Sequence, residues 1–146
     1  MKLQLSLLTL WMVWSVACGG PPVITEDGTR SDIPASGPEP GELEQTLRGH
    51  LDQLTVLIQT PNDDLQEVVF SIGRHLEFNR EEIEDTIRLI AERIAAMTPS
   101  ELAYYEERFA QYFTESSRRW FAALHAFRME HSEAASRIDS VMLIFD

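Results

Sequence analysis

Apolar residues recur at every third or fourth position from about residue 41 to the end of the chain. This spacing lines up one face of an α-helix, and no stretch of four or more residues alternates as a half-buried strand would. The first helix is predicted from about residue 40 to residue 59, where Thr60-Pro61-Asn62 ends it. Its apolar face carries Leu43, Leu47, Leu51, Leu54 and Ile58.

Two shorter helices are predicted next. The second covers about residues 63–76, with Asp63 and Asp64 favourably placed at its positive end. The third starts near Arg80, because Asn79 followed three residues later by Glu82 is typical of a capped helix start. The apolar faces of these helices carry Leu65, Val68, Val69, Ile72 and Leu76, and then Ile83, Ile87, Ile90, Ile94 and Met97.

The clearest helix start is Thr98-Pro99-Ser100-Glu101, which combines a capping threonine, a proline at the first position and a closing glutamate. A long helix is predicted from there to about residue 129, either unbroken or kinked at residues 114–117. Its apolar face carries Leu102, Tyr105, Phe109, Tyr112, Trp120, Leu124 and Phe127, thickened by Phe113 and Phe121. A last helical segment, about residues 132–145, carries Ala135, Ile138, Val141, Met142 and Phe145.

The pattern as a whole predicts an all-α protein. Residues 41–146 should form one small domain, an antiparallel bundle of four to five helices. A domain of about a hundred residues can bury a sufficient core from amphipathic helices alone.

The first seventeen residues follow a different pattern. Lys2 precedes a mostly apolar stretch over residues 3–17, which has the length of a signal peptide and is shorter than the roughly 20 residues that span a bilayer. Small residues close the stretch at Ser15 and Ala17, directly before Cys18. Residues 1–17 therefore read as an export signal.

This junction resembles the lipobox of bacterial lipoproteins, although Ser15 stands where a lipobox usually carries leucine. The resemblance implies that Cys18 receives a diacylglyceryl group and acyl chains such as palmitate, and becomes the new N-terminus. Gly19, rather than an aspartate, then implies an outer-membrane address, on its periplasmic face or at the surface. One alternative is soluble secretion, because Ser15-Val16-Ala17 also fits ordinary secretory cleavage. The other alternative is that the apolar stretch stays uncleaved and anchors the chain.

Residues 18–40 are predicted to be a disordered tether. After Cys18 this segment holds five prolines, four glycines and, beyond Val23, two large aliphatic residues, Ile24 and Ile33. Such a composition cannot bury enough apolar surface to offset the entropy of ordering the chain.

The net charge of the chain limits the classes of molecule that it is expected to bind. The chain has 24 acidic against 12 basic residues and a formal net charge of −12. Nucleic-acid binding requires basic side chains that neutralise phosphates, so no nucleic-acid partner is expected. The predicted partners are the membrane, through lipid on Cys18, and another envelope protein.

No catalytic, cofactor or metal site is predicted. None of His50, His75, His125 and His131 has an acid three residues away, so the paired Glu-x-x-His motif of di-iron bundles is missing. The single cysteine excludes a site built from several thiolates, and no nucleophile elbow or phosphate-binding glycine loop occurs. We therefore expect neither an enzyme nor a cofactor, and a haem- or metal-binding bundle is the least favoured interpretation.

Two local features have competing interpretations. Arg118-Arg119-Trp120 could be a docking spot for an anionic partner, but an intramolecular ion pair with Glu115 is preferred. Residues 97–101 loosely resemble the Leu-Thr-x-x-Gln element of small helical periplasmic stress chaperones, with Met97 and Glu101 departing from it. The whole chain is similar in style to uncharacterised small helical lipoproteins of Gram-negative bacteria.

The sequence thus predicts a membrane-anchored envelope lipoprotein whose helical bundle serves as a noncatalytic interaction or structural module. The alternative is a periplasmic chaperone-like bundle, which predicts an exposed apolar concavity. Oligomeric state and the choice between inner and outer membrane stay open at this level.

Overall fold

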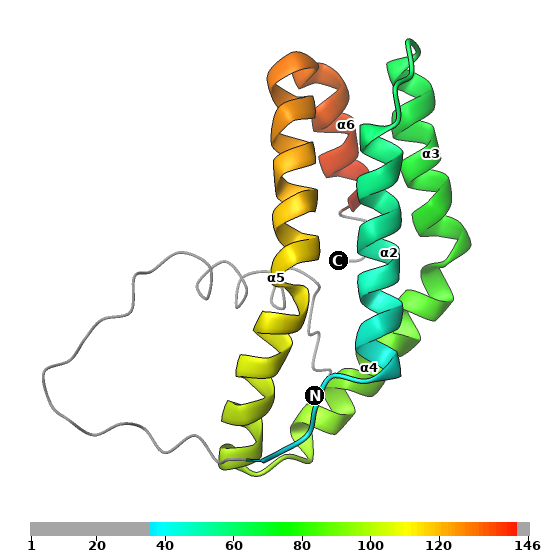
Figure 1. Ribbon diagram of the computed structural model, residues 1–146. Coiled ribbons are helices and arrows are strands. Elements are labelled where there is room, and N and C mark those ends of the chain that lie inside the picture. The colour runs from blue at the N-terminus through cyan, green and yellow to red at the C-terminus, as the bar shows by residue number, and fades with distance from the viewer. Residues whose placement is uncertain (1–35, 143–146) are drawn as a thin grey trace, which may run out of the picture.

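The computed structural model describes residues 36–142, and in them the prediction of an all-α bundle is confirmed (Figure 1). The predicted export signal, Cys18 and most of the predicted tether lie outside the described residues. The described helices are α2 (Glu42–Gln59), α3 (Leu65–Phe78), α4 (Arg80–Ala95), α5 (Pro99–Glu130) and α6 (Ser132–Met142).

Most helix ends lie within about two residues of their predicted positions, while the predicted end near residue 145, with Phe145, lies outside the described residues. The predicted cap of α4 is wrong, because the Asn79 side chain makes no capping hydrogen bond and its amide donates to the His75 carbonyl oxygen instead. Asp64 caps α3, because its side chain accepts from the backbone N–H of Gln66 at 2.9 Å. Thr98 and Glu101 form the predicted capping box of α5: the Glu101 carboxylate accepts from the Thr98 N–H at 2.8 Å, and the Thr98 hydroxyl accepts from the Glu101 N–H at 3.3 Å. The Thr98 N–H and the Thr98 hydroxyl, which donates to the same carboxylate at 2.8 Å, lower the pKa of Glu101.

Helix α5 is continuous through residues 114–117, where a kink was the alternative. The Thr114 hydroxyl donates to the carbonyl oxygen of Ala110 at 2.6 Å, a contact that bends helices. The axis of α5 changes direction near its middle in Figure 1, so the helix bends without breaking.

The helices form a bundle whose two ends differ in composition. α2 and α5 run in the same direction, while α3 followed by α4, and α6, run the opposite way (Figure 1). At one end α2, α3, α6 and α5 surround the core, and at the other end α2 packs against α4 and α5. A single residue, Asn79, links α3 to α4, so these two helices together form one arm of the bundle.

The core follows the predicted apolar faces. Trp120 is 1% exposed, and Ile72, Ala135 and Ile138 are fully buried. The main core cluster consists of Leu54, Ile58, Val68, Ile72, Leu76, Ile83, Trp120, Ala123, Phe127, Ala135 and Ile138. Phe121, which was expected to thicken the apolar face of α5, is 43% exposed, whereas Tyr104, which was not expected there, is buried.

The chain enters the bundle beside the start of α5. The Tyr104 hydroxyl donates to the carboxylate of Glu39, and Arg108 lies 3.6 Å from the same carboxylate. A Cβ atom at Gly37 would lie 2.7 Å from the Tyr104 ring, so only glycine fits against it here. These contacts fix the last residues of the predicted tether at the end of the bundle that holds the α4–α5 turn.

Candidate functional site

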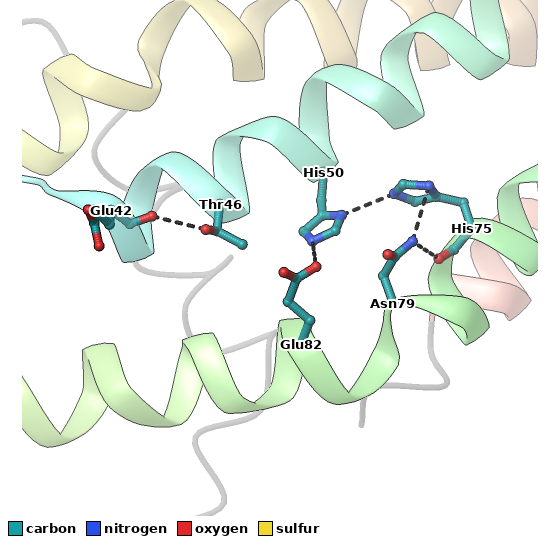
Figure 2. A network of polar contacts seen from close by, with 6 residues as sticks. All are labelled: Glu42, Thr46, His50, His75, Asn79 and Glu82. Atoms are coloured by element: carbon teal, nitrogen blue, oxygen red, sulfur yellow. Dashed lines mark hydrogen bonds and ion pairs between the residues drawn. The ribbon is translucent and has the colours of Figure 1, made fainter.

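A cluster of polar side chains joins α2, the α3–α4 link and α4 (Figure 2). His50 of α2 and His75 of α3 lie with Nδ1 of His50 3.2 Å from Nε2 of His75. Nε2 of His50 lies 3.1 Å from the carboxylate of Glu82 on α4. Asn79 holds His75 from the other side, because its amide Nδ2 donates to the His75 carbonyl oxygen at 2.7 Å. One side chain of α2 and three side chains of the arm formed by α3 and α4 thus make one continuous chain of contacts.

The hydrogen-bond partners assign the protons of both histidines. The Asn79 amide nitrogen is a donor and lies 3.4 Å from Nδ1 of His75, so that ring nitrogen is unprotonated. His75 then donates from Nε2 to Nδ1 of His50, and His50 donates from its own Nε2 to Glu82. With both rings neutral every donor has an acceptor. Burial, and secondarily the neighbouring His50, lower the pKa of His75.

This cluster makes stability depend on pH. The pKa of His75 is lower in the folded chain than its ordinary value of 6.5, so the unfolded chain binds more protons just below that pH. Stability therefore rises with pH through this window and is lost as the pH falls below 6.5. We expect the melting temperature to fall more on acidification from about pH 7.5 to about 5.5 in the wild type than in His75→Gln.

The measurement is thermal unfolding followed by circular dichroism at both pH values. His125→Gln is the matched control, because His125 is exposed on α5, and it should retain the wild-type pH dependence. Equal pH dependence in His75→Gln and the wild type would contradict the lowered pKa of His75.

A metal site is not formed by this cluster. The described residues contain no group of three or more His, Cys, Asp or Glu side chains that could hold a metal ion. The facing nitrogens of His50 and His75 bond to each other, and Glu82 lies on the far nitrogen of His50. The cluster of His50, His75, Asn79 and Glu82 instead holds α2 against α3 and α4, and we call it the His50–His75 clasp.

A second polar cluster surrounds Glu44, which is completely buried. Its carboxylate accepts from the Gly41 backbone N–H at 2.8 Å, forms an ion pair with Arg93 of α4, and accepts from the Tyr105 hydroxyl of α5. Arg93 also lies over the Tyr105 ring, with its guanidinium carbon 5.1 Å from the ring centroid. Burial raises the pKa of Tyr105, against the opposite effect of Arg93. Glu44 thereby joins three helices.

Glu44 was not predicted as a site residue, because acidic residues are numerous in the sequence and most of them form a solvated face. A signal was nevertheless present. Glu44 precedes Leu47, Leu51 and Leu54 at spacings of three, four and three residues, so it lies in register with the apolar face of its helix. A charged residue at a core position predicts a buried partner of opposite charge.

The arginine cluster of α5 forms intramolecular ion pairs, as preferred. Arg118 pairs with Glu115 one turn earlier, and Arg119 lies 3.0 Å from the Asp52 carboxylate of α2. Trp120 faces the core and is 1% exposed. The indole ring is therefore not available for docking at this position.

An open groove of about 580 Å³ lies at the end of the bundle formed by the α2–α3 link and the α5–α6 corner. Its lining is Ile58, Gln59, Thr60, Pro61, Asn62, Leu65, Val68, Ala122, Ala123, Ala126, Phe127, Glu130 and His131. Alanines on α5 provide little side-chain volume, which leaves the space between the two corners open. We call this the distal groove. It is an open concavity whose accessible lining is polar and apolar in equal measure.

The distal groove lies far from the point where the chain enters the bundle. Tyr104, which contacts the entering segment, and Ala126, which lines the groove, are separated by 22 positions of α5, or about 33 Å of helix. Figure 1 shows the two regions at opposite ends of the molecule.

Comparison of the chain with protein-family models, curated proteins and solved structures found no match. No helix within residues 36–142 is both long enough and apolar enough to cross a membrane.

Proposed function

We propose that this protein is a lipid-anchored envelope protein whose helical domain binds another protein and carries out no catalysis. The observation that supports binding is the distal groove, an open concavity of mixed polar and apolar lining at the end of the bundle opposite the entering chain. The observation that supports anchoring is Cys18 directly after an apolar stretch of signal-peptide length.

The proposed anchor has a strong physical consequence. One acyl chain binds a bilayer only marginally, at about 0.8 kcal/mol for each buried methylene, whereas two or three chains on one residue hold it permanently. The segment between Cys18 and the first described residue would let the domain move a few nanometres from the membrane surface.

Replacing Cys18 with alanine tests the anchor. In cells labelled with radioactive palmitate, the wild-type chain should carry label and fractionate with membranes, because acylation is its attachment. The Cys18→Ala chain should carry no label and leave the membrane fraction almost completely. The proposed anchor would be refuted if the wild-type chain carried no palmitate label, or if the Cys18→Ala chain stayed in the membrane fraction.

A chaperone-like function is the second candidate, because binding of unfolded clients needs an exposed concavity with apolar surface, and about half of the accessible lining of the distal groove is apolar. The two candidates differ in selectivity. A chaperone suppresses the aggregation of unrelated unfolded proteins, whereas a module for one partner does not. Light scattering of a heat-denatured client, with the wild-type chain and with an Ala126→Trp chain that fills the groove, separates them.

A further inference from the structure

The outer face of α3 carries exposed aromatic rings around an arginine. Phe78 is 87% exposed and Phe70 is 58% exposed, and Arg74 lies midway between them in the sequence. These three residues are four positions apart, so they lie along one side of the helix. The buried residues Val68, Ile72 and Leu76 form the opposite side, and α2, α4 and α6 pack against α3 there. No described helix covers the outer face (Figure 1).

Arg74 differs from the other arginines of the described residues. Ten arginines lie between residues 36 and 142, and nine of them form ion pairs with carboxylates. Arg74 forms none, and its guanidinium carbon lies 6.0 Å from the centroid of the Phe70 ring. In a domain so rich in acids, an unpaired arginine between two exposed rings is suited to a carboxylate from outside the chain.

From this face we infer that a second copy of the chain docks through α3, with the two α3 helices antiparallel about a two-fold axis at Arg74. Phe70 and Phe78 are equally distant from Arg74, so the axis places Phe70 of each copy against Phe78 of the other. Arg74, which lies over Phe70, then lies beside Glu77 of the second copy, because Glu77 directly precedes Phe78. Each copy thus supplies a carboxylate to Arg74 of the other copy and aromatic rings to the exposed rings of the other copy.

A second copy satisfies this face better than an unrelated partner does, because the pattern is symmetric. An isologous interface requires that residue i contact residue j and that j contact i, and the spacing around Arg74 meets that requirement. A single helix on each side buries less area than a standard interface, so the dimer should be weak and concentration-dependent. The net charge of −12 on each chain opposes association, so added salt should strengthen it.

Disulfide trapping tests the axis directly. A cysteine on a two-fold axis meets its own copy, and a disulfide forms only when the Cα atoms come within about 7 Å. The full chain carrying Cys18→Ala and Arg74→Cys should form a covalent dimer on mild oxidation. The matched control is the chain carrying Cys18→Ala and Arg118→Cys, because the Arg118 side chain is 73% exposed on α5, away from the proposed interface. This control chain should stay monomeric. Both chains lack the anchor, so the result is independent of lipidation.

Charge reversal tests the paired contacts. In sedimentation equilibrium of the full chain carrying Cys18→Ala, Arg74→Glu should abolish the dimer, and the double variant Arg74→Glu/Glu77→Arg should restore it. Phe78→Ala should weaken association about tenfold, whereas Met129→Ala, at another strongly exposed apolar residue, on α5, should not. The side chains substituted at positions 74, 77, 78 and 129 are all exposed, so circular dichroism should show unchanged folding.

Three outcomes would overturn the inference. One is a monomer at every concentration and salt level together with no trapping at position 74. The second is a dimer that Phe78→Ala and Arg74→Glu leave unchanged, which would place the interface elsewhere. The third is equal trapping at positions 74 and 118, which would show random collision.

Discussion

Replacing Glu44 with leucine is expected to lower the free energy of unfolding by about 3 kcal/mol. The carboxylate is completely buried and holds both Arg93 of α4 and the Tyr105 hydroxyl of α5. Its removal leaves a cation and a hydroxyl without their partner where water reaches them poorly. Breaking a fully buried ion pair costs about 3–5 kcal/mol, and the Arg93 side chain is 33% exposed, so the lower end applies. Denaturation with urea measures the loss.

A double variant separates the lost ion pair from lost packing. Glu44→Leu/Arg93→Met replaces both charges with apolar groups and should recover most of the stability that Glu44→Leu loses, since the uncompensated cation is gone. Glu42→Ala is the matched control, because Glu42 lies in the same first turn of α2 but is exposed, and it should change stability by less than about 0.5 kcal/mol. A Glu44→Leu chain as stable as the wild type would show that the ion pair is dispensable.

Truncating Trp120 to alanine is expected to cost about 3–5 kcal/mol, enough to unfold a marginal domain near physiological temperature. Trp120 is 1% exposed and belongs to the main core cluster, to which α2, α3, α5 and α6 all contribute. Removing its side chain leaves a cavity where several helices meet, and the surrounding backbone can collapse only partly. Thermal unfolding by circular dichroism measures the effect.

The indole N–H of Trp120 leads to a related prediction for the substitution of this residue by phenylalanine. Nε1 of Trp120 is buried and has no hydrogen-bond partner in the structure, so its removal costs no hydrogen bond. Trp120→Phe should therefore retain most of the stability that Trp120→Ala loses. Met129→Ala, at a residue 74% exposed on the same helix, serves as the control and should have little effect. A large loss in Trp120→Phe would indicate that the N–H is bound.

Both polar clusters bear on function by fixing the helices that carry the candidate binding surfaces. The Glu44 cluster joins α2, α4 and α5 near the point where the chain enters, and the His50–His75 clasp joins α2 to the α3–α4 link. The distal groove and the outer face of α3 are thereby presented on a braced scaffold. Surfaces carried on rigid elements lose less entropy on binding than mobile loops do.

Local features of this protein could be predicted from its sequence. The helix ends depend on residues within one turn, such as the box of Thr98 and Glu101 or the cap at Asp64, and these hydrogen bonds form wherever the helix forms. The apolar faces of α2 to α6 were likewise visible, because burial of a stripe every three or four residues is a property of the helix itself. The pairing of Arg118 with Glu115 belongs to the same class.

Contacts between helices were decided only by the tertiary structure. His50 and His75 are 25 positions apart, and Glu44 and Tyr105 are 61 apart, so no local pattern joins them. Exposure of the Phe70 ring depended equally on which side of α3 its neighbours cover. The physical reason is that a helix fixes which side chains share a face, whereas burial and pairing depend on how helices pack, and that is set by the whole core at once.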